Sequence, residues 1–269
     1  MIKSGNQAFA EALGDILTQG KKVSTRNSEV LRVRNLMYTF KSTPLVSTRR
    51  TAWKNALREW EWFMSGSNDI NTLHKEVHHW WKPWTNIADQ VPFNYSTQFR
   101  KFVGRNGLFD QVQHLRKGIE ADPYSRRNVI TTWNPADMAD PGCAITNCHG
   151  TVIQAFVEPE DNTLHLTMYQ RSCDMVLGVP HNWVQYWAFL MWLAHYSGRK
   201  VGTFTWVGGD CHIYKDHIDM AKGIIKITAV ANAAPQLVYN PTSTDFLADD
   251  FELDRPYRPL IKKSLTMTV

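Results

Sequence analysis

Cysteine is scarce in this chain: there are four in 269 residues, and no two of them form a C-x-x-C pair. Structural zinc sites and redox pairs commonly use that spacing, and the histidines match no common zinc pattern either. We therefore expect no metal site and no disulfide framework. Unpaired thiols are typical of a reducing compartment, which predicts a cytoplasmic protein.

Long apolar runs and a secretory leader are also missing. The most apolar segment, residues 183–196, is interrupted by Gln185 and is too short to cross a membrane. The first residues become polar within a few positions, which is not typical of a signal peptide. We expect a soluble protein without a membrane partner.

The chain has no dense block of Lys or Arg, although its formal net charge is +5. A nucleic-acid groove is therefore not required, and scattered arginines suit a small anionic ligand equally well. There is no repeat, low-complexity linker or break in composition. With 43% hydrophobic residues the chain can bury a large core, and we expect residues 1–269 to form one domain.

Hydrophobic periodicity predicts several long strands and several helices without regular alternation. This favours an α+β fold, with a large mixed sheet and helices packed against it. The predicted helices cover residues 6–19, 51–64, about 109–119, 183–195 and a segment around Ile218 and Ile225. The predicted strands cover residues 30–40, 128–133, 151–157, 164–169 and 200–207.

Residues 169–182 read Y-Q-R-S-C-D-M-V-L-G-V-P-H-N and lie between a predicted strand and a long apolar helix. An arginine, a serine, an aspartate and an asparagine gather at this junction, where ligand sites commonly lie. About twenty residues upstream, Cys148 stands directly before His149. Arginines or a histidine near Cys148 would lower its pKa and make it a nucleophile. An inert buried thiol is the alternative.

Three further patterns each permit two interpretations. Glu59, which stands among aromatic residues, is either solvated or held in an apolar pocket that raises its pKa. Arg126 and Arg127 are either solvated or placed at a strand end or an interface. The segment H-H-W-W-K-P-W at residues 78–84 belongs either to the core or to an aromatic binding wall, and Pro83 argues against a helix interior there.

The sequence resembles the thymidylate synthase family, which includes the pyrimidine nucleotide hydroxymethylases. The resemblance extends over nearly the whole chain. It rests on P-L-V-S-T-R-R, the Glu59 helix with W-F-M, W-K-P-W, Tyr95, D-P-Y-S-R-R, N-C-H, the 169–182 stretch, F-T-W-V-G-G-D-C-H-I-Y-K-D-H and D-F-E-L. The blocks Q-R-S-x-D-x-x-L-G-x-P-x-N and G-D-x-H-x-Y are long and specific.

The resemblance implies an enzyme that transfers a one-carbon unit from 5,10-methylene-tetrahydrofolate to C5 of a pyrimidine nucleotide, without a metal. It implies that Cys148 adds as a thiolate to C6 of the base. Glu59 would organise water and move protons, Tyr95 would lie near the C5 proton, and His149 would tune the site. Asp174 and Asn182 complete the implied catalytic set.

The resemblance also assigns the binding residues. Those implied to hold the nucleotide are Arg26, Arg126, Arg127, Gln170, Arg171, Ser172, Asn182, His212 and Tyr214, with Arg126 and Arg127 donated across a homodimer interface. Those implied to hold the folate are Arg49, Trp81, Trp84, Asp174, Gly178 and His181. An amide such as Asn182 can satisfy uracil O4 and N3–H, which favours dUMP over dCMP.

The chain departs from the family at several positions. Asn147 stands where a proline is usual and His181 where a phenylalanine is usual, while Trp183 and Gln185 replace smaller residues. Asn147 and His181 could hold a water near the transferred carbon. Water capture would give 5-hydroxymethyl-dUMP, as in a virus with modified DNA, whereas hydride transfer from the folate would give dTMP. We expect the hydroxymethylase, with thymidylate synthase as the alternative.

A non-catalytic nucleotide- or RNA-binding relative is a different class of hypothesis. A binding module has no need for a nucleophile, and this chain retains both Cys148 and Glu59. The sequence therefore favours an enzyme.

Overall fold

The structure is a computed structural model that describes residues 2–25, 28–143 and 146–263. Its centre is a six-stranded sheet in the order β1-β2-β8-β7-β6-β5. The pair β7 and β8 is parallel, and the other neighbours are antiparallel. The expected mixed sheet of an α+β fold is therefore confirmed. The strands are β1 (Lys21–Ser24), β2 (Glu29–Phe40), β5 (Val129–Ile130), β6 (Val152–Glu158), β7 (Thr163–Asp174) and β8 (Lys200–Tyr214).

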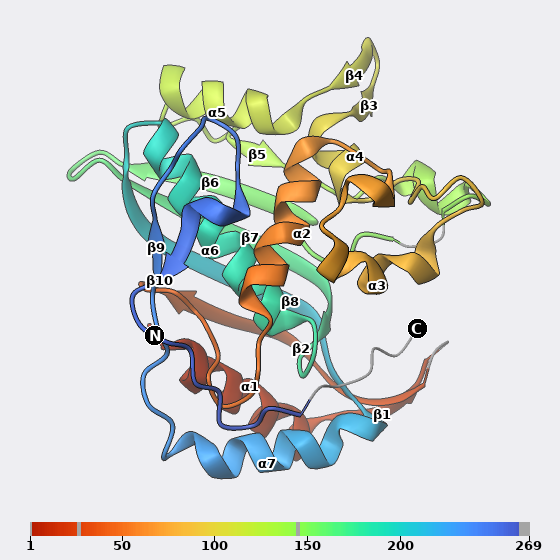
Figure 1. Cartoon of the computed structure of the whole chain (residues 1–269), viewed down its shortest axis with the longest axis vertical. Coiled ribbons are helices and arrows are strands. Elements are labelled where there is room, and N and C mark those ends of the chain that lie inside the picture. The colour runs from red at the N-terminus through yellow and green to blue at the C-terminus, as the bar shows by residue number, and fades with distance from the viewer. Residues whose placement is uncertain (1, 26–27, 144–145, 264–269) are drawn as a thin grey trace.

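Two short hairpins stand apart from the large sheet. They are formed by β3 (Phe102–Gly104) with β4 (Gly107–Phe109), and by β9 (Leu237–Tyr239) with β10 (Phe251–Leu253). The helices are α1 (Gly5–Gln19), α2 (Trp53–Ser65), α3 (His78–Trp81), α4 (Tyr95–Arg100), α5 (Gln111–Ala121), α6 (Val179–Tyr196) and α7 (Ile218–Thr228). Figure 1 shows α5 at the top of the view and α7 at the bottom, with α2 between them.

Helix α6 lies almost entirely in the core, as its nearly continuous apolar sequence predicts. Trp183 is fully buried, and its ring meets Phe9 of α1, Phe40 of β2 and Trp206 of β8. One side chain thus joins two helices to one face of the sheet. This packing sets the position of the first turn of α6, which carries Asn182.

The strands around the 169–182 stretch are longer than the sequence predicts. Strand β7 continues to Asp174, and β8 continues to Tyr214. Helix α6 already begins at Val179, with Pro180 in its first turn, where a missing N–H costs little. The polar residues lack the apolar alternation that marks a strand, but pairing with neighbouring strands satisfies their backbone groups. The junction therefore shrinks to residues 175–178.

The segment 78–84 is helical rather than a loop. Helix α3 is followed directly by a 3-10 turn over Lys82–Trp84. Pro83 lies in the first residues of this turn, where proline is tolerated. The prediction that Pro83 does not lie in a helix interior is confirmed, because the proline starts a new turn instead of interrupting an existing one.

We predict opposite effects for two neighbouring substitutions in α1. Leu13 is fully buried, so Leu13→Ala should lower the free energy of unfolding by about 2–5 kcal/mol. A Cβ on Gly14 would have no atom within 4 Å, so Gly14→Ala should raise it by about 0.5–1 kcal/mol through helix propensity. Urea unfolding measures both. A stabilising Leu13→Ala would contradict the packing of α1.

Candidate active site

Cys148 lies in the loop that precedes β6 and is partly exposed. Its N–H donates to the Tyr95 hydroxyl at 2.7 Å, and its carbonyl accepts from the N–H of Arg171 at 2.8 Å. These bonds tie the loop to α4 on one side and to β7 on the other. The thiol is thus held at the meeting point of two elements that are distant in sequence.

Opposing influences act on the Cys148 thiol. Burial raises its pKa, whereas the positive charge of Arg171 and hydrogen bonds with Tyr95 and Ser172 lower it. The effect of burial is the largest, so the pKa of the thiol is raised overall. The Nη2 atom of Arg171 lies 3.9 Å from Sγ, and its guanidinium stacks 4.9 Å from the centre of the Trp133 ring. The Cys148 thiol is therefore protonated near neutral pH, and the neighbouring Arg171 guanidinium favours its ionised form.

Tyr95 is the first residue of α4 and is buried. Its hydroxyl accepts from the N–H of Cys148 and, at 3.4 Å, from the N–H of His149. Burial raises the pKa of Tyr95 well above its usual value. The phenol therefore keeps its proton and can present it toward the space beside the thiol.

His149 does not provide the positive charge that the sequence suggested for Cys148. Burial lowers the pKa of His149 to about 3, so the ring is neutral near pH 7. The ring stacks on Tyr95 with centroids 4.1 Å apart, and its Nδ1 lies 3.0 Å from the Tyr186 hydroxyl. The next residue, Gly150, has φ +64, and a Cβ there would lie 2.2 Å from that hydroxyl. His149 therefore supports Tyr95 by packing.

Glu59 occupies the apolar pocket that was one of its two interpretations. Burial raises its pKa to about 7, although two hydrogen bonds favour the charged form. Trp81 Nε1 donates to Oε1 at 2.5 Å, and Gln185 Nε2 donates to Oε2 at 2.8 Å. A carboxyl group with this pKa can both accept and release a proton near neutral pH.

Trp81 is a core residue rather than an exposed wall. It is 5% exposed, and its ring packs against Trp62, Phe63 and Tyr95. Its indole nevertheless serves the site by holding Glu59. Trp84 and the neighbouring Trp80 are only partly buried.

Asn182 projects from the first turn of α6 into a buried set of amides. Its Oδ1 accepts from Gln170 Nε2 at 3.0 Å, and its Nδ2 donates to Gln185 Oε1 at 3.1 Å. Gln170 in turn accepts from Trp206 Nε1 at 2.9 Å. The residue implied to read the base is thus held from both sides.

Asp174 and Gly178 shape the turn between β7 and α6. Oδ1 of Asp174 accepts from the N–H groups of Val176 and Leu177, each at 3.1 Å. A Cβ on Gly178 would lie 3.9 Å from Asn182 Oδ1 and 3.8 Å from the Asp174 Cβ. Glycine therefore keeps open the space between the two implied ligand-binding side chains.

Arg49 and His181 hold the same turn through backbone contacts. Arg49 is buried and donates to the carbonyls of Val176 and Arg50. His181 Nδ1 lies 2.8 Å from the Leu177 carbonyl, and its Nε2 accepts from the Ala52 N–H at 3.1 Å. Both ring nitrogens of His181 are therefore occupied, which leaves none to hold a water. A role of this ring in packing against a folate stays a prediction.

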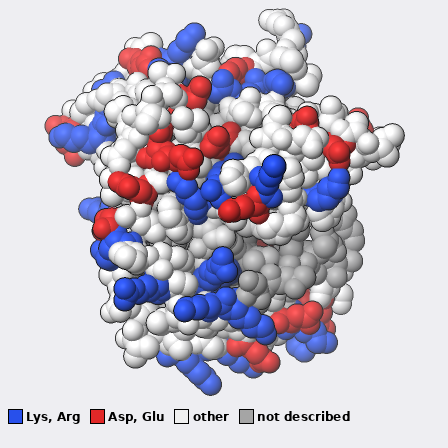
Figure 2. Space-filling model, in the orientation of Figure 1, with Lys and Arg blue, Asp and Glu red and all other residues white. Residues whose placement is uncertain are grey.

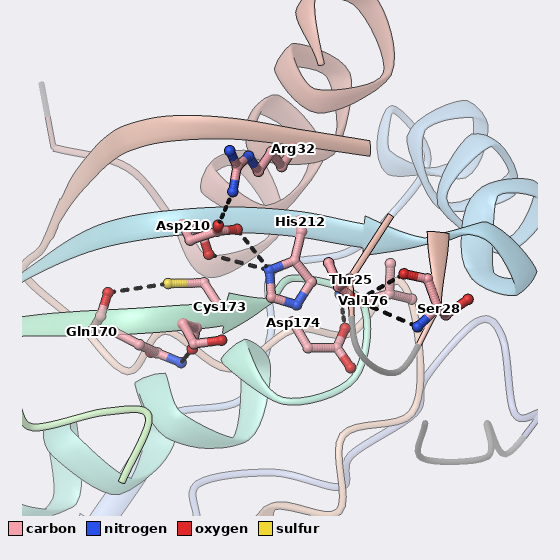
Figure 3. Close-up of polar contacts among 10 residues, drawn as sticks. Thr25, Ser28, Arg32, Gln170, Cys173, Asp174, Val176, Asp210 and His212 are labelled. Carbon is pink, nitrogen blue, oxygen red and sulfur yellow. Dashed lines mark hydrogen bonds and ion pairs between the residues drawn. The ribbon is translucent and has the colours of Figure 1, made fainter. Parts of the chain in front are cut away.

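His212 lies on β8 and is oriented by an ion pair (Figure 3). Its Nδ1 is 3.0 Å from Asp210 Oδ1, and Asp210 Oδ2 is 2.9 Å from Arg32 Nη1. The Tyr214 ring packs edge-on against His212 at 5.2 Å. Because Asp210 accepts from Nδ1–H, Nε2 of His212 remains an acceptor that suits a sugar hydroxyl.

The implied nucleotide-binding arginines that the structure describes lie in two separate places. Arg171 and Ser172 lie beside Cys148, whereas Arg126 and Arg127 are exposed in the turn that precedes β5. Arg26 lies outside the described residues. Figure 2 shows Lys and Arg interspersed with Asp and Glu on the visible face.

The sequence was also compared with known proteins. The family model described as thymidylate synthase matches residues 7–269. This chain belongs to the thymidylate synthase family. One relative, the thymidylate synthase of Buchnera aphidicola subsp. Baizongia pistaciae (strain Bp), is 33% identical over 229 residues. The match covers 83% of this chain and 84% of the relative.

Family membership establishes a folate-dependent enzyme that transfers a one-carbon unit and acts on dUMP. Thymidylate synthases use methylene-tetrahydrofolate as co-substrate. Among the described residues, no group of three His, Cys, Asp or Glu side chains is placed to hold a metal. No helix in the described part of the chain is long and apolar enough to span a membrane.

Sequence reasoning missed three functional features of this family member. Gln185 was noticed as a departure but received no role, although it contacts both Glu59 and Asn182. Asp210 was part of a quoted motif without a function, and its partner Arg32 lies 178 positions away. The Trp80 ring packs edge-on against the His181 ring, with centroids 5.4 Å apart. The unusual size of Gln185 among family members could have indicated its contacts, whereas no sequence signal indicated those of Asp210 and Trp80.

The partly buried His181 should make folding sensitive to acid. Burial lowers its pKa from 6.5 to about 3. Between pH 6.5 and pH 3, His181 is therefore protonated in the unfolded chain but neutral in the folded chain. Stability should therefore fall as the pH decreases from 6.5 toward 3, by about 1.4 kcal/mol per pH unit for this one group.

We expect His181→Gln to reduce that slope by about 1.4 kcal/mol per pH unit. Urea unfolding at a series of pH values measures it. The matched control is His79→Gln, because His79 is exposed on the short helix α3. Equal slopes for His181→Gln and the native chain would show that His181 titrates normally.

Proposed function

We propose that this enzyme makes 5-hydroxymethyl-dUMP from dUMP, water and 5,10-methylene-tetrahydrofolate. The Cys148 thiolate adds to C6 of uracil, and the resulting nucleophilic C5 attacks the one-carbon unit. Loss of the C5 proton and of tetrahydrofolate leaves an exocyclic methylene. Water adds its oxygen to that carbon, a base takes the water proton, and expulsion of the thiolate restores the C5–C6 double bond.

The positions of three side chains support the covalent steps. Arg171 lies beside the Cys148 thiol and favours its ionised form. The Tyr95 hydroxyl lies against the same residue, where it can take part in proton transfer at C5. Glu59 has a pKa of about 7 and can exchange protons with the base through water.

Water capture is supported by one buried atom of the residue that precedes the nucleophile in the sequence. Asn147 is 4% exposed, and its Nδ2 donates to the Thr132 carbonyl at 3.1 Å. Its Oδ1 is buried and has no hydrogen-bond partner among the described residues. A cavity of about 10 Å³ lies against Asn147, Thr132 and Trp133, which is near the lower limit for one water. A polar orphan atom next to such a cavity is a suitable water site.

Thymidylate formation is the second candidate function. His181 has no ring nitrogen left for a water, so only Asn147 remains of the two residues invoked for water capture. The Buchnera relative is named a thymidylate synthase. In that case hydride from tetrahydrofolate reduces the methylene, and the products are dTMP and dihydrofolate.

One reaction separates the two products. Purified protein with dUMP and methylene-tetrahydrofolate should yield a nucleotide that is heavier than dTMP by one oxygen, together with tetrahydrofolate. Mass spectrometry of the nucleotide and absorbance of dihydrofolate measure this. Asn147→Ala should lower the hydroxymethyl share by removing the water ligand. Formation of dTMP with an equal amount of dihydrofolate would establish the second candidate instead.

Cys148→Ser is the control for chemistry in the same assay. It should abolish turnover and retain dUMP binding, because a serine hydroxyl is not ionised near neutral pH. Turnover by this variant would refute the covalent route for either product.

We also propose that the enzyme is a homodimer formed through the large sheet. An apolar row crosses four paired strands: Met37 pairs with Val207, Val207 with Tyr169, and Tyr169 with Val152. Three of these are notably exposed, at 66% for Met37, 37% for Tyr169 and 43% for Val152. A second copy would cover this row isologously, and Arg126 and Arg127 would then serve the site of the partner subunit.

Tyr169→Glu should convert the dimer to a monomer and reduce activity together with it, because the charge would be buried between the two sheets. Analytical ultracentrifugation measures the mass. Val230→Glu is the matched control, since Val230 is 74% exposed after α7 and outside the row. A native chain that sediments as a monomer would contradict the proposal.

We further propose that residues 1–269 act as a single catalytic domain. The buried apolar residues form one continuous cluster that extends from Ala8 to Phe251. A core shared by α1 and β10 supports one domain, because separate domains each have their own hydrophobic core.

A further inference from the structure

A continuous chain of hydrogen bonds passes through Asn182, the residue implied to bind the base. It begins at Trp206 of β8, passes through Gln170 of β7, and continues through Asn182 and Gln185 of α6 to Glu59 of α2. The four donor–acceptor distances are 2.9, 3.0, 3.1 and 2.8 Å. Gln185 also donates to the Ala56 carbonyl at 2.9 Å. Gln170, Asn182 and Gln185 are all buried.

The two ends of this chain of hydrogen bonds determine the direction of every amide in it. The Trp206 indole can only donate, so Gln170 must turn its carbonyl toward it and its NH₂ toward Asn182. The Ala56 carbonyl can only accept, so Gln185 must turn its NH₂ toward it and its carbonyl toward Asn182. Asn182 therefore receives a donor on one side and an acceptor on the other. Reversing its amide would set two like groups against each other.

This constraint leaves Asn182 one N–H and one lone pair in a defined arrangement. The acceptor lies on the Gln170 side and the remaining N–H on the Gln185 side. Uracil presents a carbonyl O4 beside a donor N3–H, and cytosine presents the reverse pair at the same atoms. A base held in place by its sugar and phosphate can match only one direction of the amide. The direction of the Asn182 amide is therefore a specificity determinant.

We propose that Gln185 is a positioning residue that sets the direction of the Asn182 amide and so favours uracil over cytosine nucleotides. The inference rests on the proposed action on dUMP. It also explains why this chain carries a long amide where smaller residues are usual in the family. Gln185 reaches Asn182, one turn earlier on α6, and Glu59 across the helix interface at the same time.

The same side chain connects base recognition to the proton-transferring carboxyl group. Each oxygen of Glu59 accepts one N–H, from Trp81 or Gln185, and both bonds favour the ionised form. Tyr95 of α4 is the titratable neighbour of Glu59, and it remains protonated because burial raises its pKa. Removing the Gln185 donor should therefore raise the pKa of Glu59 further.

Two variants of Gln185 separate its two contacts. Gln185→Met keeps the length of the side chain but removes both the acceptor for Asn182 and the donor to Glu59. Gln185→Glu keeps an acceptor for Asn182, removes the NH₂ donor and places a second carboxyl group beside Glu59, whose pKa should rise for both reasons. Gln111→Met is the matched control, because Gln111 is also a buried glutamine that donates to backbone carbonyls, but at the start of α5.

The first measurement is the affinity for dUMP relative to dCMP, by calorimetry, with each variant made in the Cys148→Ser protein so that no turnover intervenes. Gln185→Met should lower the preference for dUMP about tenfold, the value of one hydrogen bond. Gln185→Glu and Gln111→Met should retain the preference. Equal weakening of both nucleotides in Gln185→Met would show a purely structural role and overturn the proposal.

The second measurement is the pH profile of kcat/KM for dUMP in proteins that retain Cys148. The limb that reports Glu59 should move to higher pH in Gln185→Met and Gln185→Glu, and stay in place in Gln111→Met. An unmoved limb in both Gln185 variants would overturn the connection to Glu59. Failure of the proposed water capture is distinguishable, because it changes the product of turnover and leaves the relative affinities of the Cys148→Ser proteins unaffected. Failure of the action on dUMP would appear as a Cys148→Ser protein, with Gln185 retained, that does not prefer dUMP.

Discussion

The parallel pairing of β7 with β8 is the constraint on which the site depends. Its register places Cys173 beside Cys211 and Asp174 beside His212, so the ends of both strands reach the same edge. Residues implied to contact base, folate and sugar are about forty positions apart in sequence and meet only through this pairing. Parallel strands require a long crossover. Here the crossover contains α6, whose first turn adds Asn182 to the same edge.

Burial of polar groups is the second organising feature. Gln170, Asn182 and Gln185 are buried and Glu59 is partly buried, in surroundings where an unpaired polar atom is costly. Each is paired with another member of the set or with an indole N–H. Such a fully paired network holds a unique geometry because any reversed amide leaves two groups unsatisfied. Asn147 Oδ1 lies outside this network and is one of several buried side-chain atoms without a partner among the described residues, and a bound water would satisfy it.

The sequence was informative wherever local physics decides. Periodicity placed α1 and α2 to within about two residues at each end, and it also correctly placed β2 and β6. It was less informative where pairing decides. The polar ends of β7 and β8 carry no apolar alternation and were not assigned to strands. Similarly, α6 begins before its apolar run, because Pro180 and the Asp174 turn start the helix instead.

By itself, the sequence determined the fold class and the family, because long motifs and hydrophobic patterns are local properties. The tertiary structure decided between the two interpretations of Glu59, since only Trp81 and Gln185 create its pocket. It also excluded His181 as a water ligand, because both ring nitrogens are already hydrogen-bonded to the backbone of Ala52 and Leu177. It also gave Gln185 a role. Contacts between residues more than a hundred positions apart depend on packing, which no local pattern encodes.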